Sequence, residues 1–333
     1  MIELRNVSKK YPDGTVAVTD LTLSAPNGRI TALVGPSGCG KTTTLRMVNR
    51  LIEPSSGEIL LDGESVKSRD VVELRRHIGY VIQNAGLLPH RTVIDNIETV
   101  PRLEKKNIDK AALRERARSL MDMVGLDSSF EDKYPGQLSG GQSQRVGVAR
   151  ALAADPPFML MDEPFSAVDP VVRKQLQTEF LKIQAKVAKT IIIVTHDIDE
   201  ALLLADQVVV LGEKAKIEQI GTPEELLNAP ANGFVRNFLG KGRDYRALAF
   251  GSSAGLVLDP LPVTHPGGEI RTGDVLDAAT LDWAVTVGTD NLQACLDATL
   301  AAPAGRAVAV DPSGRVAGSF DSGAVTAAAR AQE

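Results

Sequence analysis

The chain has 333 residues, of which 37 are Lys or Arg, 42 are Asp or Glu and 43% are hydrophobic. This length and apolar fraction suffice for two globular domains with complete cores. No apolar run approaches the roughly 18 residues of a transmembrane helix, and the start lacks the apolar stretch of a signal peptide, so we expect neither a membrane-spanning nor a secreted protein. The two cysteines are too few for a disulfide framework, which fits a reducing cytoplasm. The net charge of −5 argues against binding of nucleic acid through a broad basic surface.

The charges are unevenly distributed along the chain. Residues 245–333 contain five Arg, no Lys and ten acidic residues, whereas the preceding residues carry basic and acidic side chains in equal number. Lysine disappears and Ala and Gly become frequent at the same place. We therefore predict a first domain over residues 1–240, a linker over 241–250 and a second domain over 251–333.

Short, uninterrupted apolar runs in the first domain predict strands that are buried on both faces. Such strands are typical of a parallel sheet that is covered by helices. Helical spacing lies between them, as at Leu176, Phe180 and Ile183 after an Asp169-Pro170 start. A further helix between Asp109 and Gly125 falls in a mostly helical insertion. The pattern predicts an α/β domain. The apolar runs are Ile30–Val34, Phe158–Met161, Ile191–Val194 and Val208–Leu211.

The run from Gly35 to Thr42 has the P-loop pattern, with a predicted strand before it and helical spacing after it. In such a loop the backbone N–H groups surround phosphate oxygens, Lys41 supplies a positive charge to the β and γ phosphates, and the Thr42 hydroxyl can bind Mg²⁺. A glycine-rich turn that matches by chance is the alternative, which the flanking pattern disfavours. The run predicts a site for ATP and Mg²⁺. The residues assigned to ATP are Gly35, Pro36, Ser37, Gly38, Cys39, Gly40, Lys41, Thr42 and Thr43.

The predicted strand at Phe158–Met161 ends in two carboxylates, Asp162 and Glu163. One carboxylate can bind in the Mg²⁺ shell and the next can take a proton from the attacking water, as phosphoryl transfer requires. Two acidic residues at the end of a strand are also common at ordinary turns. The functional interpretation therefore depends on the P-loop upstream.

The stretch Leu138-Ser-Gly-Gly-Gln-Ser-Gln-Arg145 closely resembles the signature sequence of ATP-binding cassette (ABC) ATPases, with Ser143 where Gln is usual. Independently of the resemblance, Ser139 is a suitable N-cap, and the start of the helix would suit an anion. A capped helix without a further role is the alternative. The resemblance implies a P-loop NTPase fold of the ABC type: a parallel sheet with helices, an N-terminal antiparallel β subdomain and a helical subdomain at about 88–155.

The remaining ABC motifs occur in the family's order, and the resemblance implies their roles. Tyr11 resembles the aromatic residue that stacks on adenine, and Gln83 resembles the Q-loop glutamine that reaches Mg²⁺ and the attacking water. His196 resembles the switch histidine at the γ phosphate, and Ser166 to Asp169 resembles the D-loop, with Val168 where Leu is usual. The predicted catalytic residues are Glu163, His196 and Gln83. The predicted Mg²⁺ ligands are Thr42, Gln83 and Asp162.

The family resemblance also implies a head-to-tail dimer with a second copy of the chain. Each ATP would then lie between the P-loop of one subunit and the signature of the other. The residues supplied by the partner subunit would be Ser139, Gly140, Gly141, Gln142 and Asp169.

The length of the insertion distinguishes between classes of ABC protein. Chromosome-maintenance and DNA-repair members insert long coiled coils, whereas only 55 positions separate Gln83 from Leu138 here. Translation-factor members usually carry two P-loops and two signatures, and this chain has one of each. We therefore expect a transporter subunit at the cytoplasmic face of the cell membrane. It would bind integral-membrane permease subunits and work with an extracytoplasmic substrate-binding protein.

Several segments resemble the ATPases of bacterial importers of quaternary amines, such as glycine betaine, carnitine and choline. The alternative that stays open is an importer of amino acids, such as methionine. The segments are Ile78–His90, Asp95–Pro101, Val146–Arg150, His196–Ala201, Gly221–Glu225, Phe234–Gly240 and Arg243–Leu248.

The acidic tail shows a strand, a helix, two strands around a turn and a closing helix between residues 285 and 328. The expected helix face carries Leu292, Cys295, Leu296 and Leu300. This order resembles one CBS motif, a small α+β regulatory unit, and only residues 250–284 precede it, which is too few for a second motif. We predict a single or degenerate CBS-like domain that pairs with its twin. An Ala/Gly-rich appendage with little order is the alternative.

Overall fold

The computed structural model describes the chain apart from a few short segments. The described residues are 1–83, 85–104, 109–166, 168–240, 242–259, 263–265, 268–276, 281–302 and 305–332, and of 104, 171, 263–265, 268 and 269 only the backbone is described. The chain divides into two compact units, Met1–Leu226 and Leu227–Glu333, which are treated separately below. Among the described helices, none has both the length and the apolarity to cross a lipid bilayer.

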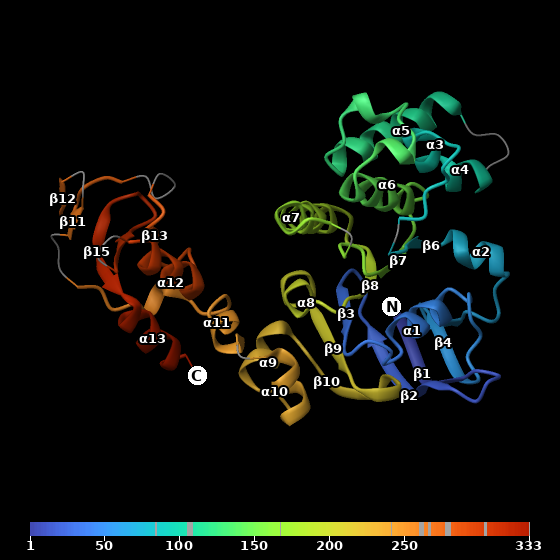
Figure 1. Ribbon diagram of the computed structural model, residues 1–333, viewed down its shortest axis with the longest axis horizontal. Helices are drawn as coiled ribbons and strands as arrows, with labels where there is room; N and C mark the ends of the chain where they lie inside the picture. The colour runs from blue at the N-terminus through green and yellow to red at the C-terminus, as the bar shows by residue number, and fades with distance from the viewer. Residues whose placement is uncertain are drawn as a thin grey trace. The chain divides into compact units, whose positions relative to one another are not determined.

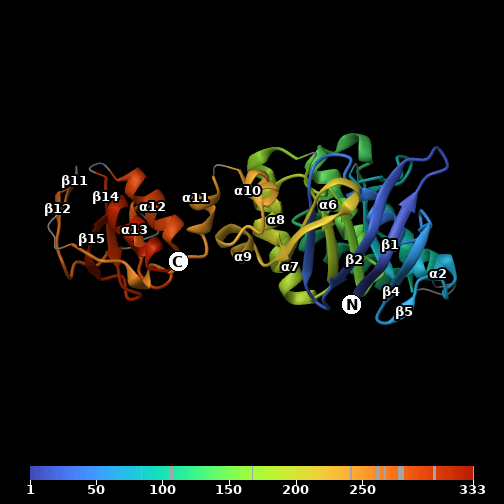
Figure 2. The ribbon, with the colours of Figure 1, turned by 90° about the horizontal axis from the view of Figure 1, so that it is seen from below.

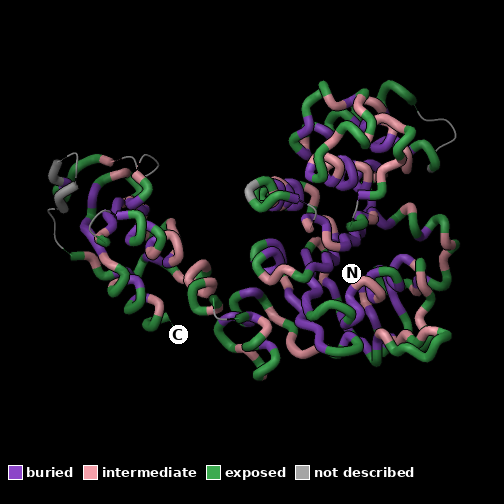
Figure 3. The backbone as a smooth tube through the Cα atoms, viewed as in Figure 1, coloured by how far each residue is buried: buried purple, intermediate pink, exposed green. Residues whose placement is uncertain are grey.

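A mainly parallel sheet lies at the centre of the first unit (Figure 1). Its strands are β3 (Ile30–Val34), β6 (Ile78–Val81), β7 (Phe158–Asp162), β8 (Thr190–Val194), β9 (Gln207–Leu211) and β10 (Ile217–Gly221). Their order is β10-β9-β3-β8-β7-β6, with β10 antiparallel to β9 and the other pairs parallel. Every residue of β3, β7 and β8 is buried, which confirms the prediction from the uninterrupted apolar runs (Figure 3).

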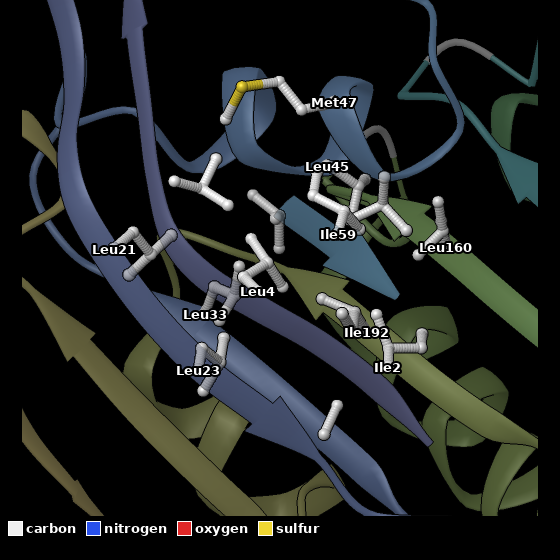
Figure 4. Close-up of a cluster of buried hydrophobic side chains, with 14 of the residues drawn as sticks. Ile2, Leu4, Leu21, Leu23, Leu33, Leu45, Met47, Ile59, Leu160 and Ile192 are labelled. Atoms are coloured by element: carbon white, nitrogen blue, oxygen red, sulfur yellow. The ribbon is translucent and has the colours of Figure 1, made fainter. Parts of the chain in front are cut away.

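An antiparallel sheet from the N-terminal part of the chain packs beside the central sheet (Figure 2). Its strands are β1 (Ile2–Lys10), β2 (Val16–Ala25), β4 (Ser56–Leu61) and β5 (Glu64–Ser65), in the order β2-β1-β4-β5. Leu4 and Leu21 of this sheet share one buried cluster with Leu33 and Ile192 of the central sheet and Leu45 of helix α1 (Lys41–Val48) (Figure 4). Burial of each such side chain contributes about 1.5 to 3 kcal/mol, so this cluster fixes α1 between the two sheets.

Most helices between β6 and β7 form a separate helical subdomain (Figure 1). They are α3 (Val93–Ile97), α4 (Thr99–Glu104), α5 (Lys110–Met123), α6 (Gly140–Leu152) and the 3-10 helices Ser128–Phe130 and Pro135–Gln137. The expected limits of α5 are confirmed, because the Asp109 carboxylate accepts hydrogen bonds from the first amides and Gly125 has φ +69°. Besides α1, the described part of this unit has the helices α2 (Val71–Arg76), α7 (Pro170–Val187), α8 (Ile198–Leu204) and the 3-10 helix Glu213–Ala215, and α9 (Pro223–Asn228) begins in it and ends in the second unit.

The second unit contains a three-stranded sheet within its described residues, in the order β13-β14-β15. Strand β14 runs parallel to β13 and antiparallel to β15, and its alternate residues are buried on opposite faces. Ala307 and Ala309 face a cluster with Phe320, whereas Val308 and Val310 face a cluster with Trp283. The elements are α10 (Gly233–Leu239), α11 (Arg243–Ala247), a 3-10 helix (Ser253–Gly255), β11 (Val263–His265), β12 (Gly268–Ile270), β13 (Ala284–Thr286), α12 (Leu292–Ala301), β14 (Arg306–Val310), β15 (Val316–Asp321) and α13 (Ser322–Arg330).

The order of elements in the tail follows the prediction, but the expected face of α12 is partly wrong. Leu292 and Cys295 are buried, whereas 75% of Leu300 is exposed and Thr299 is buried in its place. At about 100° per residue, position 299 lies on the line of Leu292 and Cys295, and position 300 is turned away from it. The Thr299 hydroxyl tolerates burial because it donates a hydrogen bond to the Leu296 carbonyl.

The segment predicted as a linker, 241–250, contains helix α11, and Leu248 packs against the core of the second unit. Lys241 lies outside the described residues. The compact units divide at residues 226 and 227, ahead of the predicted boundary. The domain bounds therefore stay a prediction.

Candidate nucleotide-binding site

The predicted site residues follow neighbouring strands of the central sheet. The P-loop follows β3, His196 follows β8, Asp162 and Glu163 end β7, and Gln83 follows β6. These strands are adjacent and parallel, so their carboxyl ends meet at one edge of the sheet. In open α/β sheets this edge is where ligands bind.

The glycines of the P-loop are required by the backbone. Gly35, Gly38 and Gly40 have φ of +155°, +79° and +111°, which side-chain-bearing residues rarely adopt. A Cβ at Gly35 would lie 2.2 Å from the Leu211 carbonyl oxygen, and one at Gly40 would lie 2.5 Å from the Ala17 carbonyl oxygen. The loop therefore packs closely against β9 and β2 and then continues into α1.

Lys41 lies inside the curve of the loop. Its Nζ donates hydrogen bonds to the Gly35 carbonyl at 2.7 Å and the Pro36 carbonyl at 2.9 Å, and the residue is only 7% exposed. Cys39 is buried beside it, as expected of a small residue that fills the loop. The geometry thus holds one positive charge where the loop would surround phosphate oxygens.

Two of the three predicted Mg²⁺ ligands are next to each other, whereas the third, Gln83, forms its hydrogen bond with Glu163. The Thr42 hydroxyl donates a hydrogen bond to Asp162 Oδ1 at 2.9 Å. Burial raises the pKa of the Asp162 carboxyl, a cost that a bound cation would offset. Mg²⁺ takes hard oxygen ligands, usually one or two from protein together with water and phosphate, so these residues fit the ion. Within the described residues no cluster of three or more His, Cys, Asp or Glu side chains forms another metal site.

Glu163 contacts both of the other predicted catalytic side chains. Glu163 Oε2 accepts a hydrogen bond from Gln83 Nε2 at 2.9 Å, and Glu163 Oε1 lies 3.2 Å from His196 Nδ1. Glu163 has φ +47°, and its N–H donates to the Val194 carbonyl of β8 at 2.8 Å. The backbone at the end of β7 therefore turns to present this carboxylate between Gln83 and His196.

Tyr11 lies within reach of the P-loop helix. Its Oη is 3.4 Å from Thr43 Oγ1, and the Lys9 ammonium is 5.3 Å from the centre of its ring. The structure thus places an aromatic ring beside the loop, where the family resemblance expects the adenine.

The signature motif lies in the helical subdomain, away from the P-loop of the same chain (Figure 1). Ser139 caps α6 through a capping box: Gln142 N–H donates to Ser139 Oγ at 3.2 Å, and Ser139 N–H donates to Gln142 Oε1 at 2.9 Å. Gly141 is buried against Val168, whereas Ser139, Gly140 and Asp169 are exposed. Ala167 of the predicted D-loop lies outside the described residues.

Sequence reasoning missed three arginines around the site. The positive charge of Arg46 acts on Asp162, and its position four residues after Thr42 on α1 is the pattern that could have revealed it. Arg150 of α6 donates to the Ala85 and Gly86 carbonyls, just after Gln83, at 2.6 and 2.7 Å. Burial lowers the pKa of Arg150, because removal from water disfavours the charged form of the guanidinium. Arg173 of α7, the third of them, contacts the Val168 carbonyl and the Asp197 carboxylate.

Comparisons with known proteins agree with this arrangement. The sequence model of the ABC transporter family matches residues 18–166. The chain is 54% identical over 243 residues to the glycine betaine/carnitine/choline transport ATP-binding protein OpuCA of Bacillus subtilis, with 73% of this chain and 63% of that protein covered. It is 51% identical over 267 residues to the osmoprotectant import ATP-binding protein OsmV of Salmonella typhimurium, with 79% and 69% covered.

A solved cassette has the same fold. The dimeric structure of MJ0796, a bacterial ABC transporter cassette, is similar with a TM-score of 0.62 at 32% identity, over 67% of this chain and 99% of that one. The chain spans about 63% of the length of OpuCA. Because the match to OsmV extends over more than two thirds of that relative at 51% identity, the chain belongs to the family of ABC transporter ATP-binding proteins.

Proposed function

We propose that the chain is the ATP-hydrolysing subunit of an importer for a quaternary-amine osmoprotectant such as glycine betaine. The observation that carries the ATPase function is the contact of Glu163 with both Gln83 and His196, beside the Thr42–Asp162 pair. The relatives named after glycine betaine, carnitine, choline or osmoprotectants are 48 to 54% identical to the chain. The names of these relatives favour a quaternary amine as the transported solute over an amino acid, which is the alternative that the sequence left open.

Different residues of the chain would carry out different parts of the reaction. Lys41 and the loop amides would bind the β and γ phosphates, with Tyr11 on the adenine. Thr42, Asp162 and Gln83 would hold Mg²⁺, which when bound would supply charge neutralisation at the phosphates. Glu163 takes a proton from the attacking water, and His196 holds the carboxylate and the γ phosphate in place. No covalent intermediate is needed, because positioning and charge carry phosphoryl transfer.

We propose that two copies of the chain form the working ATPase. The signature residues of one copy, Ser139 to Gln142, would complete the site of the other together with Asp169. The solved structures of the cassette MJ0796 are dimeric, which supports the pairing of two copies. Integral-membrane permease subunits and an extracytoplasmic substrate-binding protein would complete the importer, with the chain peripheral at the cytoplasmic face of the membrane.

Residues 251–333 are proposed to act as a single CBS-like regulatory domain. The parallel pair β13–β14 with α12 between them, followed by the hairpin to β15 and by α13, supports this assignment. The domain has no lysine and a negative net charge, which disfavours binding to an anionic membrane surface and favours pairing with its twin in the dimer.

The proposed function is tested in liposomes that contain the chain with its co-purified membrane partners. We expect internal glycine betaine-binding protein and glycine betaine to raise the rate of ATP hydrolysis several-fold. Methionine is the matched control, since it represents the amino-acid alternative. ATP hydrolysis that responds to methionine and ignores glycine betaine would overturn the proposed substrate, and absence of any ATP hydrolysis would overturn the enzyme assignment.

The shared site makes a separate prediction for Ser139→Arg. A bulky cation in place of the N-cap would block closure on the nucleotide of the partner, while the P-loop of each subunit stays intact. We expect ATP binding within about threefold of wild type and a loss of ATP hydrolysis of at least about 100-fold. Ser128→Arg, at an exposed serine elsewhere in the helical subdomain, is the control. Normal turnover in Ser139→Arg would argue against the shared site.

A further inference from the structure

Arg173 of α7 joins two segments that carry catalytic residues. Its Nη2 donates a hydrogen bond to the Val168 carbonyl at 3.0 Å, and its Nη1 lies 3.4 Å from Asp197 Oδ2. Val168 belongs to the loop that begins at Glu163, and Asp197 directly follows His196. One guanidinium thus bridges the loop of the proposed base and the segment of the switch histidine.

Each of the two segments is also held by hydrogen bonds of its own. The Ser166 hydroxyl donates to the Glu163 carbonyl at 2.9 Å, which closes the loop after β7. Asp197 caps α8, since its Oδ1 accepts from the Asp199 and Glu200 amides at 2.9 and 3.3 Å. A shift of Asp197 would therefore move the start of α8 and His196 with it.

Beside this bridge lies a buried carboxyl group without a full set of partners. Glu200 is 4% exposed, and its Oε1 has no hydrogen-bond partner. Nε of Arg173 is also buried without a hydrogen-bond partner. An unpaired buried polar group is costly, so a hydrogen bond between Arg173 and Glu200 would satisfy both groups.

The groups around Glu200 determine whether its carboxyl is ionised, and thereby which residues Arg173 contacts. The charged groups that face it are Asp197 at the start of α8, Arg173 on α7 and Glu163 after β7, with the Thr195 hydroxyl as a hydrogen-bond partner. Burial, and then the negative charge of Asp197, raise the pKa of Glu200 to about 8. Near neutral pH the carboxyl is therefore mostly uncharged, which leaves Arg173 bound to Val168 and Asp197.

We propose that Arg173 is a positioning residue for ATP hydrolysis, which holds the switch-histidine segment on the loop of Glu163, and that Glu200 competes with Asp197 for it once Glu200 is ionised. This inference rests on the proposed ATPase function. Arg173 and Asp197 are half-buried and Glu200 is buried, and none of the three belongs to the predicted nucleotide site.

The first test measures amide hydrogen exchange of the full chain and does not depend on ATP hydrolysis. In Arg173→Met we expect the amides of residues 198–204 to exchange about tenfold faster, because the cap of α8 loses its anchor, while β3 and β8 keep their protection. Lys174→Met, which removes the exposed neighbouring charge, is the control. Arg173→Lys keeps one of the two contacts and should be intermediate. Unchanged exchange in both Arg173 variants would overturn the proposal.

The second test measures kcat and KM for ATP from pH 6.5 to 9.5 in the complex with the membrane partners. Arg173→Met should lower kcat about 10- to 100-fold with KM within about threefold, since the catalytic groups are displaced but the P-loop is not. The kcat of wild type should fall as pH rises through about 8, and Glu200→Gln should remove that fall. An identical alkaline fall in Glu200→Gln would overturn the role of Glu200. Inactive wild type would contradict the proposed function, while the exchange result would still decide the role of Arg173.

Discussion

Glu163→Gln is expected to bind ATP with nearly normal affinity and to lose about 100- to 10,000-fold in the rate of hydrolysis. The amide has the shape of the carboxylate and still reaches Gln83 and His196, but it cannot accept a proton from water. The variant should accumulate as an ATP-bound dimer, because closure no longer leads to hydrolysis. Single-turnover hydrolysis and size-exclusion chromatography with ATP measure the two effects.

The matched control for this prediction is Glu224→Gln, which changes an exposed glutamate outside the site. Its rate should equal that of wild type. Hydrolysis within threefold of wild type in Glu163→Gln would show that another group accepts the proton, and His196 would then be the next residue to replace.

Lys41→Ala is expected to weaken nucleotide binding itself. A hydrogen bond to a charged group contributes about 1.5 to 3 kcal/mol, which corresponds to about a 10- to 100-fold loss of affinity for ATP. Adenosine, which lacks phosphates, should bind wild type and Lys41→Ala equally. Isothermal titration with ATP and with adenosine measures the difference.

The control is Lys67→Ala, which removes an exposed lysine of the same unit. If Lys41→Ala bound ATP as wild type does, the loop would have to hold phosphate through its amides alone. The role given to Lys41 would then be wrong.

The central sheet and the site edge could be predicted from the sequence because each depends on local patterns. Uninterrupted apolar runs identify β3, β7 and β8, and the carboxyl ends of parallel strands bring Lys41, Glu163 and His196 to one edge. The capped starts of α5 and α6 are also local, since a side chain and the amides two or three residues later form them.

The network of Arg173, Asp197 and Glu200 could not be predicted in this way. Arg173 is 24 residues from Asp197 in the chain, and their contact depends on how α7 packs beside the end of β8. Leu300 shows the second limit: this apolar residue of α12 is exposed, because the helical step of about 100° turns it away from the face on which Thr299 is buried.

The hairpin β14–β15 has a consequence for the folding of the second unit. Because β14 has alanines on one face and valines on the other, a shift of one residue would exchange small and large side chains between two cores. The turn prevents this shift, since Asp311 Oδ1 accepts hydrogen bonds from the amides of Ser313 and Arg315 at 2.8 and 3.0 Å. The Ser313 hydroxyl, which donates to the same oxygen at 2.6 Å, and then the Arg315 amide hold the pKa of Asp311 below its usual range. The pairing of the strands is thereby set by contacts within five residues, before either core has to form.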